Sequence, residues 1–216
     1  MTVAVKICGL TSAEAVQASV RAGAQFGGLV FHPASPRNLA LDQARALSAQ
    51  MAGTLKRVAL VADRNDADLA AIIAAASPDY LQLHGHESVA RTAEIRARFA
   101  LPVIKALPVA LADDLKAAND YAPVADFFLF DAKPPKNAAR AGGHGAAFDW
   151  TLLAGRSFPK PWFLAGGLDP ENVARAITAS GAAMVDVSSG VESAPGVKSA
   201  ERINQFIAAT RQTVQA

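Results

Sequence analysis

The chain has 216 residues, of which 51% are hydrophobic and 19% are charged, and its formal net charge is only +2. This balance excludes a disordered chain and predicts neither a nucleic-acid nor a membrane partner. The single cysteine, Cys8, excludes an internal disulfide, and the N-terminus lacks the basic head and apolar run of a signal peptide, so a soluble, cytoplasmic protein is expected.

Short apolar runs alternate along the chain with longer, alanine-rich segments of helical period. Near-continuous apolarity is typical of parallel strands that are covered on both faces. The expected strands are, in chain order, Val3–Cys8, Phe26–Phe31, Leu55–Ala62, Tyr80–Leu83, Pro102–Leu107, Phe127–Phe130, Trp162–Ala165 and Met184–Val187. Among the expected helix starts, Thr11–Glu14 fits a capping box, Asp169-Pro170 places a cap before a first-turn proline, and Ala40–Asp42 offers no cap side chain.

This alternation of strands and helices predicts a parallel sheet, which either closes into a barrel or stays open and doubly wound. Eight comparable units favour closure, whereas an open sheet would usually carry a nucleotide-binding loop after its first strand. The first strand instead continues into Cys8–Thr11, without a G-x-G-x-x-G motif or a P-loop. The sequence therefore predicts an α/β protein, a single-domain (β/α)8 TIM barrel over residues 1–216, with its active site at the C-terminal strand ends.

The first two strands end in polar residues. Lys6 and Cys8 face the same way because strand side chains alternate, and a neighbouring ammonium group is expected to depress the thiol pKa, which makes Cys8 a candidate base. The alternative is that Cys8 is a small buried hydrophobic residue. After the second strand, Arg37 follows a proline-stiffened loop and is a candidate for binding a carboxylate or phosphate, unless it is an ordinary surface arginine.

The fourth strand ends in Gln82 and His84, which share a face and are expected to line the pocket. His84, His86 and Glu87 suggest a metal, but no further acidic or histidine cluster completes a ligand set, so no metal is expected.

The sixth strand ends in Asp131, directly after Phe127–Phe130. A carboxylate at a barrel-strand end is expected to act as a general acid, the alternatives being a helix cap or an ion pair with Lys133. The basic, glycine-containing loop Ala132–Ala147 is predicted to be a lid over the site.

Glycine-containing loops follow the seventh and eighth strands, and each is a candidate phosphate-binding segment. Such loops often hold phosphate in barrels through their backbone amides, so we expect a small phosphorylated molecule as the ligand. The candidate residues are Gly166, Gly167, Ser188, Ser189 and Gly190. Within the eighth strand, Asp186 points inward and is expected to pair with Lys6 on the neighbouring first strand, which is compatible with substrate contact.

These residues together resemble the phosphoribosylanthranilate isomerase family of tryptophan biosynthesis. The resemblance extends from the first strand to the last helix. It is carried by Lys6–Thr11, Gly28–Phe31, Ser35–Arg37, Leu81–Gly85, Phe130-Asp131, Gly142–Gly145, Phe148–Trp150, Leu164–Leu168, Asn172-Val173, Val185–Glu192, Pro195, Gly196 and Lys198. It implies a cofactor-free isomerase that converts N-(5-phosphoribosyl)anthranilate to 1-(2-carboxyphenylamino)-1-deoxyribulose 5-phosphate by an Amadori rearrangement.

The resemblance also implies a role for each candidate. Asp131 would protonate the furanose ring oxygen, and Cys8 would remove the C2 proton of the opened sugar. Arg37 would hold the anthranilate carboxylate, Asp186 would lie near the linking amine, and the two glycine loops would hold the phosphate. A monomer and a homodimer both remain open.

Two other functions remain open from the sequence. One is another sugar-phosphate isomerase barrel of the histidine-pathway type, although that type relies on a pair of aspartates and this first strand ends in Cys8. The other is a non-catalytic phosphate-ligand-binding barrel, which would need no activated thiol.

Overall fold

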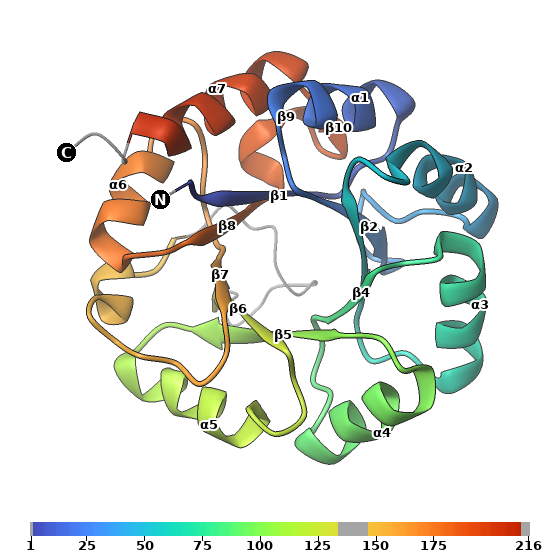
Figure 1. Cartoon of the computed structure of the whole chain (residues 1–216), viewed down its shortest axis with the longest axis horizontal. Coiled ribbons are helices and arrows are strands. Elements are labelled where there is room, and N and C mark those ends of the chain that lie inside the picture. Colours follow the sequence, from blue (N-terminus) through green and yellow to red (C-terminus); the bar gives the residue numbers. More distant parts are fainter. Residues whose placement is uncertain (1, 134–146, 213–216) are drawn as a thin grey trace.

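A computed structural model of the chain describes residues 2–133 and 147–212. Its centre is a closed barrel of parallel strands, in which each strand is hydrogen-bonded to the next and β8 returns to β1 (Figure 1). The barrel strands are β1 (Ala4–Cys8), β2 (Phe26–Phe31), β3 (Lys56–Val61), β4 (Tyr80–Leu83), β5 (Val103–Val109), β6 (Phe127–Ala132), β7 (Trp162–Leu164) and β8 (Met184–Val187). The predicted barrel is thus confirmed, and the strand bounds differ from the predicted ones by at most two residues at an end.

Helices surround the barrel in Figure 1 and cover the outer face of its strands. The helices are α1 (Ala13–Ala22), α2 (Leu41–Met51), α3 (Asp66–Ala76), α4 (Val89–Phe99), α5 (Ala117–Tyr121), α6 (Val173–Ser180) and α7 (Ala200–Gln212), with the 3-10 helices η1 (Ala112–Lys116), η2 (Trp150–Leu153) and η3 (Ser189–Val191). Between β6 and β7 the described residues form η2 and no α-helix. A short antiparallel hairpin of β9 (Glu192–Ala194) and β10 (Val197–Lys198) follows η3.

The N-cap of helix α1 lies one residue later than the capping box Thr11–Glu14 predicts. Ser12 is the N-cap, and its hydroxyl accepts the Ala15 amide at 3.2 Å. The Thr11 hydroxyl instead donates to the Gly196 carbonyl at 2.8 Å. Thr11 therefore joins the loop after β1 to the β9–β10 hairpin rather than capping the helix.

Helix α6 also begins later than predicted, at Val173 rather than after Asp169. The Asp169 carboxylate accepts the amides of Glu171 and Asn172, at 2.9 and 2.8 Å, and so forms a turn ahead of the helix. Helix α2 starts at its predicted place, after Ala40, without a side-chain cap.

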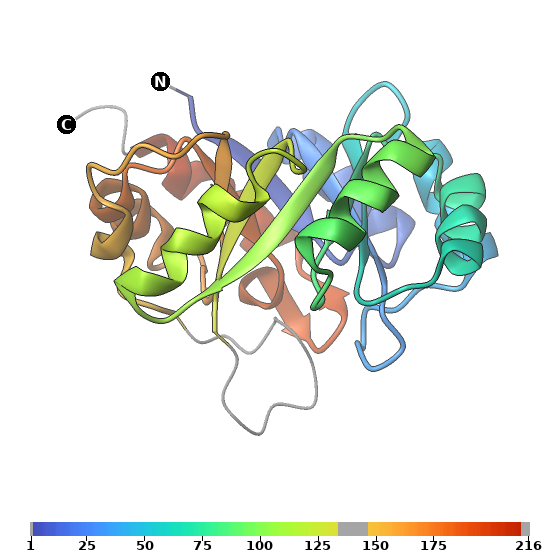
Figure 2. The ribbon, with the colours of Figure 1, turned by 90° about the horizontal axis from the view of Figure 1, so that it is seen from below.

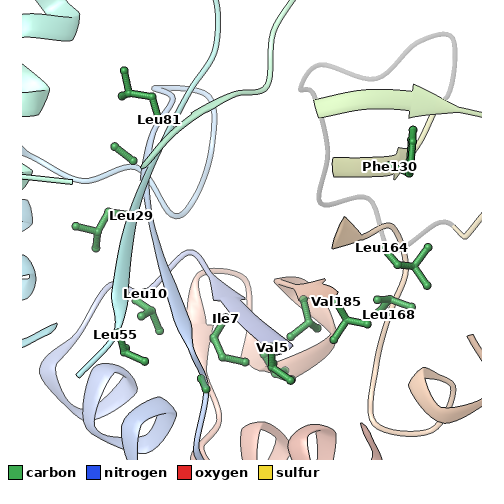
Figure 3. Close-up of a cluster of buried hydrophobic side chains, with 14 of the residues drawn as sticks. Val5, Ile7, Leu10, Leu29, Leu55, Leu81, Phe130, Leu164, Leu168 and Val185 are labelled. Carbon is green, nitrogen blue, oxygen red and sulfur yellow. The ribbon is translucent and has the colours of Figure 1, made fainter. Parts of the chain in front are cut away.

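Most of the hydrophobic core lies between the strands and the helices. Val5, Ile7 and Val185 belong to this layer, part of which is drawn in Figure 3. Since Val5 and Ile7 face the helices, the alternate residues Lys6 and Cys8 face the barrel interior. A smaller apolar cluster fills the inside of the barrel and consists of Val58, Ile104, Ala106, Leu129, Phe163 and Ala165.

The side view in Figure 2 places the β9–β10 hairpin and the loop after β2 at one end of the barrel. This is the end at which the barrel strands terminate and at which the polar candidates of the sequence were expected. None of the helices in the described residues is both long enough and apolar enough to span a bilayer.

Candidate active site

Lys6 and Asp186 form an ion pair inside the barrel. The Lys6 Nζ lies 2.9 Å from Asp186 Oδ1, and the Lys6 side chain is completely buried. Burial alone would lower the pKa of Lys6, but attraction to Asp186 and Cys8 outweighs it and raises the pKa above its ordinary value. The predicted pair is confirmed, and it places a stable positive charge on the strand that carries Cys8.

Cys8 is buried at the end of β1, with only 4% of its surface exposed. Burial raises the pKa of the thiol, and attraction to Lys6 and Lys198 offsets that effect only in part. The expected depression of the thiol pKa is therefore wrong, because the loss of solvent outweighs the nearby ammonium groups. The Ser188 hydroxyl donates to the Cys8 carbonyl at 3.1 Å, which joins the end of β1 to the loop after β8.

Asp131 ends β6 next to the polar residues that end β4. Its Oδ2 lies 3.2 Å from His84 Nε2, and its Oδ1 accepts the following amide, that of Ala132, at 2.9 Å. Gln82 Nε2 lies 2.9 Å from His84 Nδ1; when this amide donates, His84 carries its proton on Nε2 and donates it to Asp131. The alternative interpretation, an ion pair of Asp131 with Lys133, is not found among the described residues, where Lys133 Nζ instead lies 3.4 Å from Asp114 Oδ1.

The sequence placed Gln82 and His84 in the pocket but missed the contact of His84 with Asp131. Two features of the sequence could have predicted this contact. Gln82 and His84 share one face of their strand, and β4, β5 and β6 are consecutive strands of the barrel. Both His84 and Asp131 side chains are mostly buried, with 12% and 14% of their surface exposed. The two groups therefore interact at the rim of the barrel interior rather than in open solvent.

The histidines and the acid after β4 are directed to different partners. The exposed His86 ring lies 3.0 Å from Asp63 Oδ2, whereas the buried Glu87 carboxylate binds Lys105 Nζ at 2.7 Å. In the part of the chain that the structure describes, no three or more His, Cys, Asp or Glu side chains are grouped so that they could hold a metal ion.

The loops after β7 and β8 touch each other through their backbones. A Cβ built on Gly190 would lie 1.9 Å from the Leu168 carbonyl oxygen, so only glycine fits there. Gly166 has φ +85°, and a Cβ there would lie 2.5 Å from the Ala132 amide, directly after Asp131. Glycine thus brings the backbone of each loop close to its neighbour.

Backbone amides of these loops are available to a ligand. Within residues 2–133 and 147–212, no acceptor is found for the amides of Gly167, Ser189 and Gly190. Asn172 Nδ2 donates to the Gly167 carbonyl at 2.8 Å and holds the first loop against the turn before α6. Unpaired amides on adjoining loops can receive the oxygens of an anion such as phosphate.

Arg37 is not an ordinary surface arginine, which was the alternative to a binding role. Its Nε and Nη2 donate to Glu192 Oε1 and Oε2 at 2.6 and 2.8 Å, and only 7% of its side-chain surface is exposed. The sequence missed this partner, because nothing local predicts that the hairpin after β8 reaches the loop after β2. The predicted lid, Ala132–Ala147, lies largely in residues 134–146, which are outside the described residues.

Residues 5–209 match the family described as N-(5'phosphoribosyl)anthranilate (PRA) isomerase. The N-(5'-phosphoribosyl)anthranilate isomerase of Rhodopseudomonas palustris strain HaA2 is 53% identical over 211 residues, which cover 98% of this chain and 97% of the relative. The protein of the same name from Paracoccus denitrificans is 55% identical over 208 residues, covering 96% of this chain and 97% of the relative.

Solved structures of the same enzyme are similar throughout the chain. The phosphoribosyl anthranilate isomerase of Thermotoga maritima has a TM-score of 0.87 at 34% identity, covering 97% of this chain and 99% of that one. A structure of a phosphoribosyl anthranilate isomerase in complex with reduced 1-(o-carboxyphenylamino)-1-deoxyribulose 5-phosphate has a TM-score of 0.82 at 32% identity, with the same coverage. A third, with the same TM-score, identity and coverage, contains monomers generated from a dimeric Thermotoga maritima isomerase.

Proposed function

The chain belongs to the N-(5'-phosphoribosyl)anthranilate isomerase family, and we propose that it isomerises this substrate with Cys8 as the general base and Asp131 as the general acid. The reaction is a step of tryptophan biosynthesis. The observation that carries the residue assignment is that both groups lie at the barrel mouth, the end at which the barrel strands terminate. Their strands, β1 and β6, are three places apart around the ring. A ligand between them would meet a thiol on one side and a carboxyl group on the other.

The chemistry needs one proton donor and one proton acceptor. Asp131 gives a proton to the furanose ring oxygen as the C1–O bond breaks, and the nitrogen lone pair forms a C1=N double bond. Cys8 then takes the C2 proton, and the C–H electron pair forms a C1=C2 double bond while the nitrogen regains its lone pair. The resulting enol becomes the ketone by gaining a proton at C1 and losing its hydroxyl proton. No electrons enter or leave, so the proposal includes no cofactor.

Other parts of the mouth accommodate the remaining groups of the substrate. The amides of Gly166, Gly167, Ser188, Ser189 and Gly190 would hold the phosphate, and Arg37 would bind the anthranilate carboxylate. Asp186 would lie near the linking amine while still paired with Lys6. In this proposal residues 1–216 form one barrel domain in the cytoplasm, as a monomer or a homodimer.

A fluorescence assay tests the proposed function. The fluorescence of the anthranilate sugar is followed after purified protein is added to freshly prepared N-(5'-phosphoribosyl)anthranilate. We expect enzyme-dependent loss of fluorescence, in proportion to protein concentration. Absence of any loss at micromolar protein would contradict the function itself.

Replacing Arg37 with alanine should weaken substrate binding. The lost hydrogen bonds to a charged carboxylate are worth about 1.5–3 kcal/mol, so kcat/KM should fall by about 10- to 150-fold, mainly through KM. Steady-state kinetics measures the split. Arg45→Ala is the matched control, because Arg45 is exposed on α2 and pairs with the exposed Asp42. An unchanged KM in folded Arg37→Ala protein would remove Arg37 from the carboxylate site.

Replacing Gly190 with alanine should damage the phosphate site. The added methyl group collides with the Leu168 carbonyl, so the loop must move, at a cost of about 1–3 kcal/mol in folding stability. We expect KM to rise by at least about tenfold, because the loss of a well-placed charged hydrogen bond has this size. The control is Gly155→Ala, where φ is +65° and no atom of the described residues lies within 4 Å of the added Cβ, so that this variant adds backbone strain without a collision. A normal KM in a folded Gly190→Ala protein would place the phosphate elsewhere.

A further inference from the structure

Glu192 is the centre of a buried polar cluster that also contains Arg37 and Lys198. Its Oε1 accepts Arg37 Nε at 2.6 Å and Lys198 Nζ at 2.7 Å, and its Oε2 accepts Arg37 Nη2 at 2.8 Å and the Gly196 amide at 3.2 Å. The exposed side-chain fractions are 7% for Arg37, 5% for Glu192 and 0% for Lys198. Arg37, Lys198 and the Gly196 amide thus all donate to one carboxylate, and Lys198 Nζ also donates to the Ser188 carbonyl at 3.0 Å.

The formal charges of the cluster do not cancel. Burial would raise the pKa of Glu192, but Arg37 and Lys198 outweigh that effect and lower it, so the carboxylate is ionised at neutral pH. This carboxylate faces the Arg37 guanidinium and the Lys198 amine in a place with little access for water, and burial lowers the pKa of Lys198 although Glu192 opposes that effect. An uncompensated buried charge is costly, so a ligand group with a single negative charge would complete the cluster.

The β9–β10 hairpin also fixes the loop that carries Arg37. The Thr11 hydroxyl donates to the Gly196 carbonyl at 2.8 Å, and a Cβ on Gly196 would lie 2.7 Å from the Pro36 carbonyl oxygen. On the other side, a Cβ on Gly9 would lie 2.4 Å from Arg37 Cδ, so the arginine stem occupies space that only glycine leaves free. Arg37 is thus confined by the hairpin and by the loop after β1.

We propose that Glu192 is a positioning residue that holds Arg37 in the orientation needed to bind the substrate's ring carboxylate, and thereby sets the preference for a carboxylated aromatic amine. The proposal rests on the proposed function, because it takes Arg37 to be the carboxylate-binding group. By occupying Nε and Nη2, Glu192 leaves the Nη1 side of the guanidinium for the ligand.

Two effects of removing Glu192 oppose each other. Loss of its negative charge would strengthen the attraction of Arg37 for an anion, whereas loss of its bidentate bond would let the guanidinium turn away. In Glu192→Gln one oxygen becomes an NH₂ group, which must face the donors of Arg37, Lys198 or Gly196. Because charged recognition by arginine depends on the direction of its N–H groups, the loss of orientation should dominate.

Binding of two stable ligands tests the proposal without turnover. One is reduced 1-(o-carboxyphenylamino)-1-deoxyribulose 5-phosphate, and the other is the same compound without the carboxyl group, with Kd measured by calorimetry. The unmodified chain should prefer the carboxylated ligand by about 10- to 150-fold. In Glu192→Gln the preference should fall to within about threefold, while the Kd of the carboxyl-free ligand stays unchanged.

Two further variants distinguish the position of the Glu192 carboxylate from its charge, and from non-specific effects of a substitution. Glu192→Asp keeps the charge but draws the carboxylate back by one methylene, so a positioning role predicts a reduced preference. Glu94→Gln, which alters an exposed partner of Arg91 on α4, should keep the full preference. Glu192→Asp also keeps an acceptor for both cations, so it remains informative if Glu192→Gln does not fold.

The results that overturn the proposal are distinct from failure of the proposed function. An unchanged preference in both Glu192 variants would show that the residue is only structural. A greater preference in Glu192→Gln would show that Glu192 repels the ligand rather than orienting Arg37. If the unmodified chain does not discriminate between the ligands, the carboxylate is not bound at Arg37, and the assignment in the proposed function fails together with this proposal.

Discussion

Cys8→Ala is expected to lower kcat by about 10²–10⁴-fold, the usual contribution of a general base, with little change in KM. The thiol lies at the end of β1 inside the barrel, and no other cysteine occurs in the chain. Removing it leaves the loops proposed to bind phosphate and carboxylate in place, so binding should persist while proton removal from C2 is lost. Steady-state fluorescence kinetics measures both parameters.

The pH dependence of kcat in the unmodified chain tests the same assignment of Cys8. Burial raises the pKa of Cys8, so the thiolate forms only at higher pH and its fraction grows by about tenfold per pH unit below that pKa. We therefore expect kcat to rise from neutral into alkaline pH, and Cys8→Ser to lose this rise because a hydroxyl does not ionise there. Near-normal kcat in Cys8→Ala would remove Cys8 as the base.

Asp131→Asn is expected to lower kcat by a similar factor, about 10²–10⁴-fold, again with little change in KM. The amide has nearly the shape of the carboxyl group and can keep a hydrogen bond to His84, but it cannot protonate the ring oxygen. The measurement is kcat and KM under the conditions used for the unmodified chain, together with thermal unfolding to show that the variant is folded.

The same substitution near the other end of this strand is the control. Asp126 immediately precedes β6 and binds Arg96 and the Val103 amide, so Asp126→Asn should reduce stability but leave kcat unchanged. If Asp131→Asn retained near-normal turnover, the acid would have to be another group, and the neighbouring His84 would be the first to examine.

The barrel could be predicted from sequence because its signals are local and repeated. Each apolar run is a strand covered on both faces, and the bounds of β2, β4 and β8 are as predicted. The helix starts were less predictable where several residues compete for one role. Thr11 and Ser12 are both good caps, and Thr11 is engaged by Gly196, a contact 185 residues away in sequence.

The candidate site was predictable in position but not in its electrostatics. The Lys6–Asp186 pair followed from strand alternation and from the adjacency of β1 and β8 in a closed barrel. The direction in which the Cys8 pKa shifts could not be predicted in this way, because it depends on how completely the surrounding chain excludes water from the thiol. The contacts of Arg37 with Glu192, and of His84 with Asp131, join elements far apart in sequence and needed the folded chain.

The most direct test of the division of labour between Cys8 and Asp131 is a crystal structure of the chain with reduced 1-(o-carboxyphenylamino)-1-deoxyribulose 5-phosphate bound. We expect Cys8 Sγ to face the sugar C2 at about 3–3.5 Å, and an Asp131 oxygen to lie about 2.6–3.2 Å from O4, the former ring oxygen. The phosphate should rest on the loops after β7 and β8. A ligand whose C2 points away from Cys8, or whose O4 is out of reach of Asp131, would contradict the proposed acid and base.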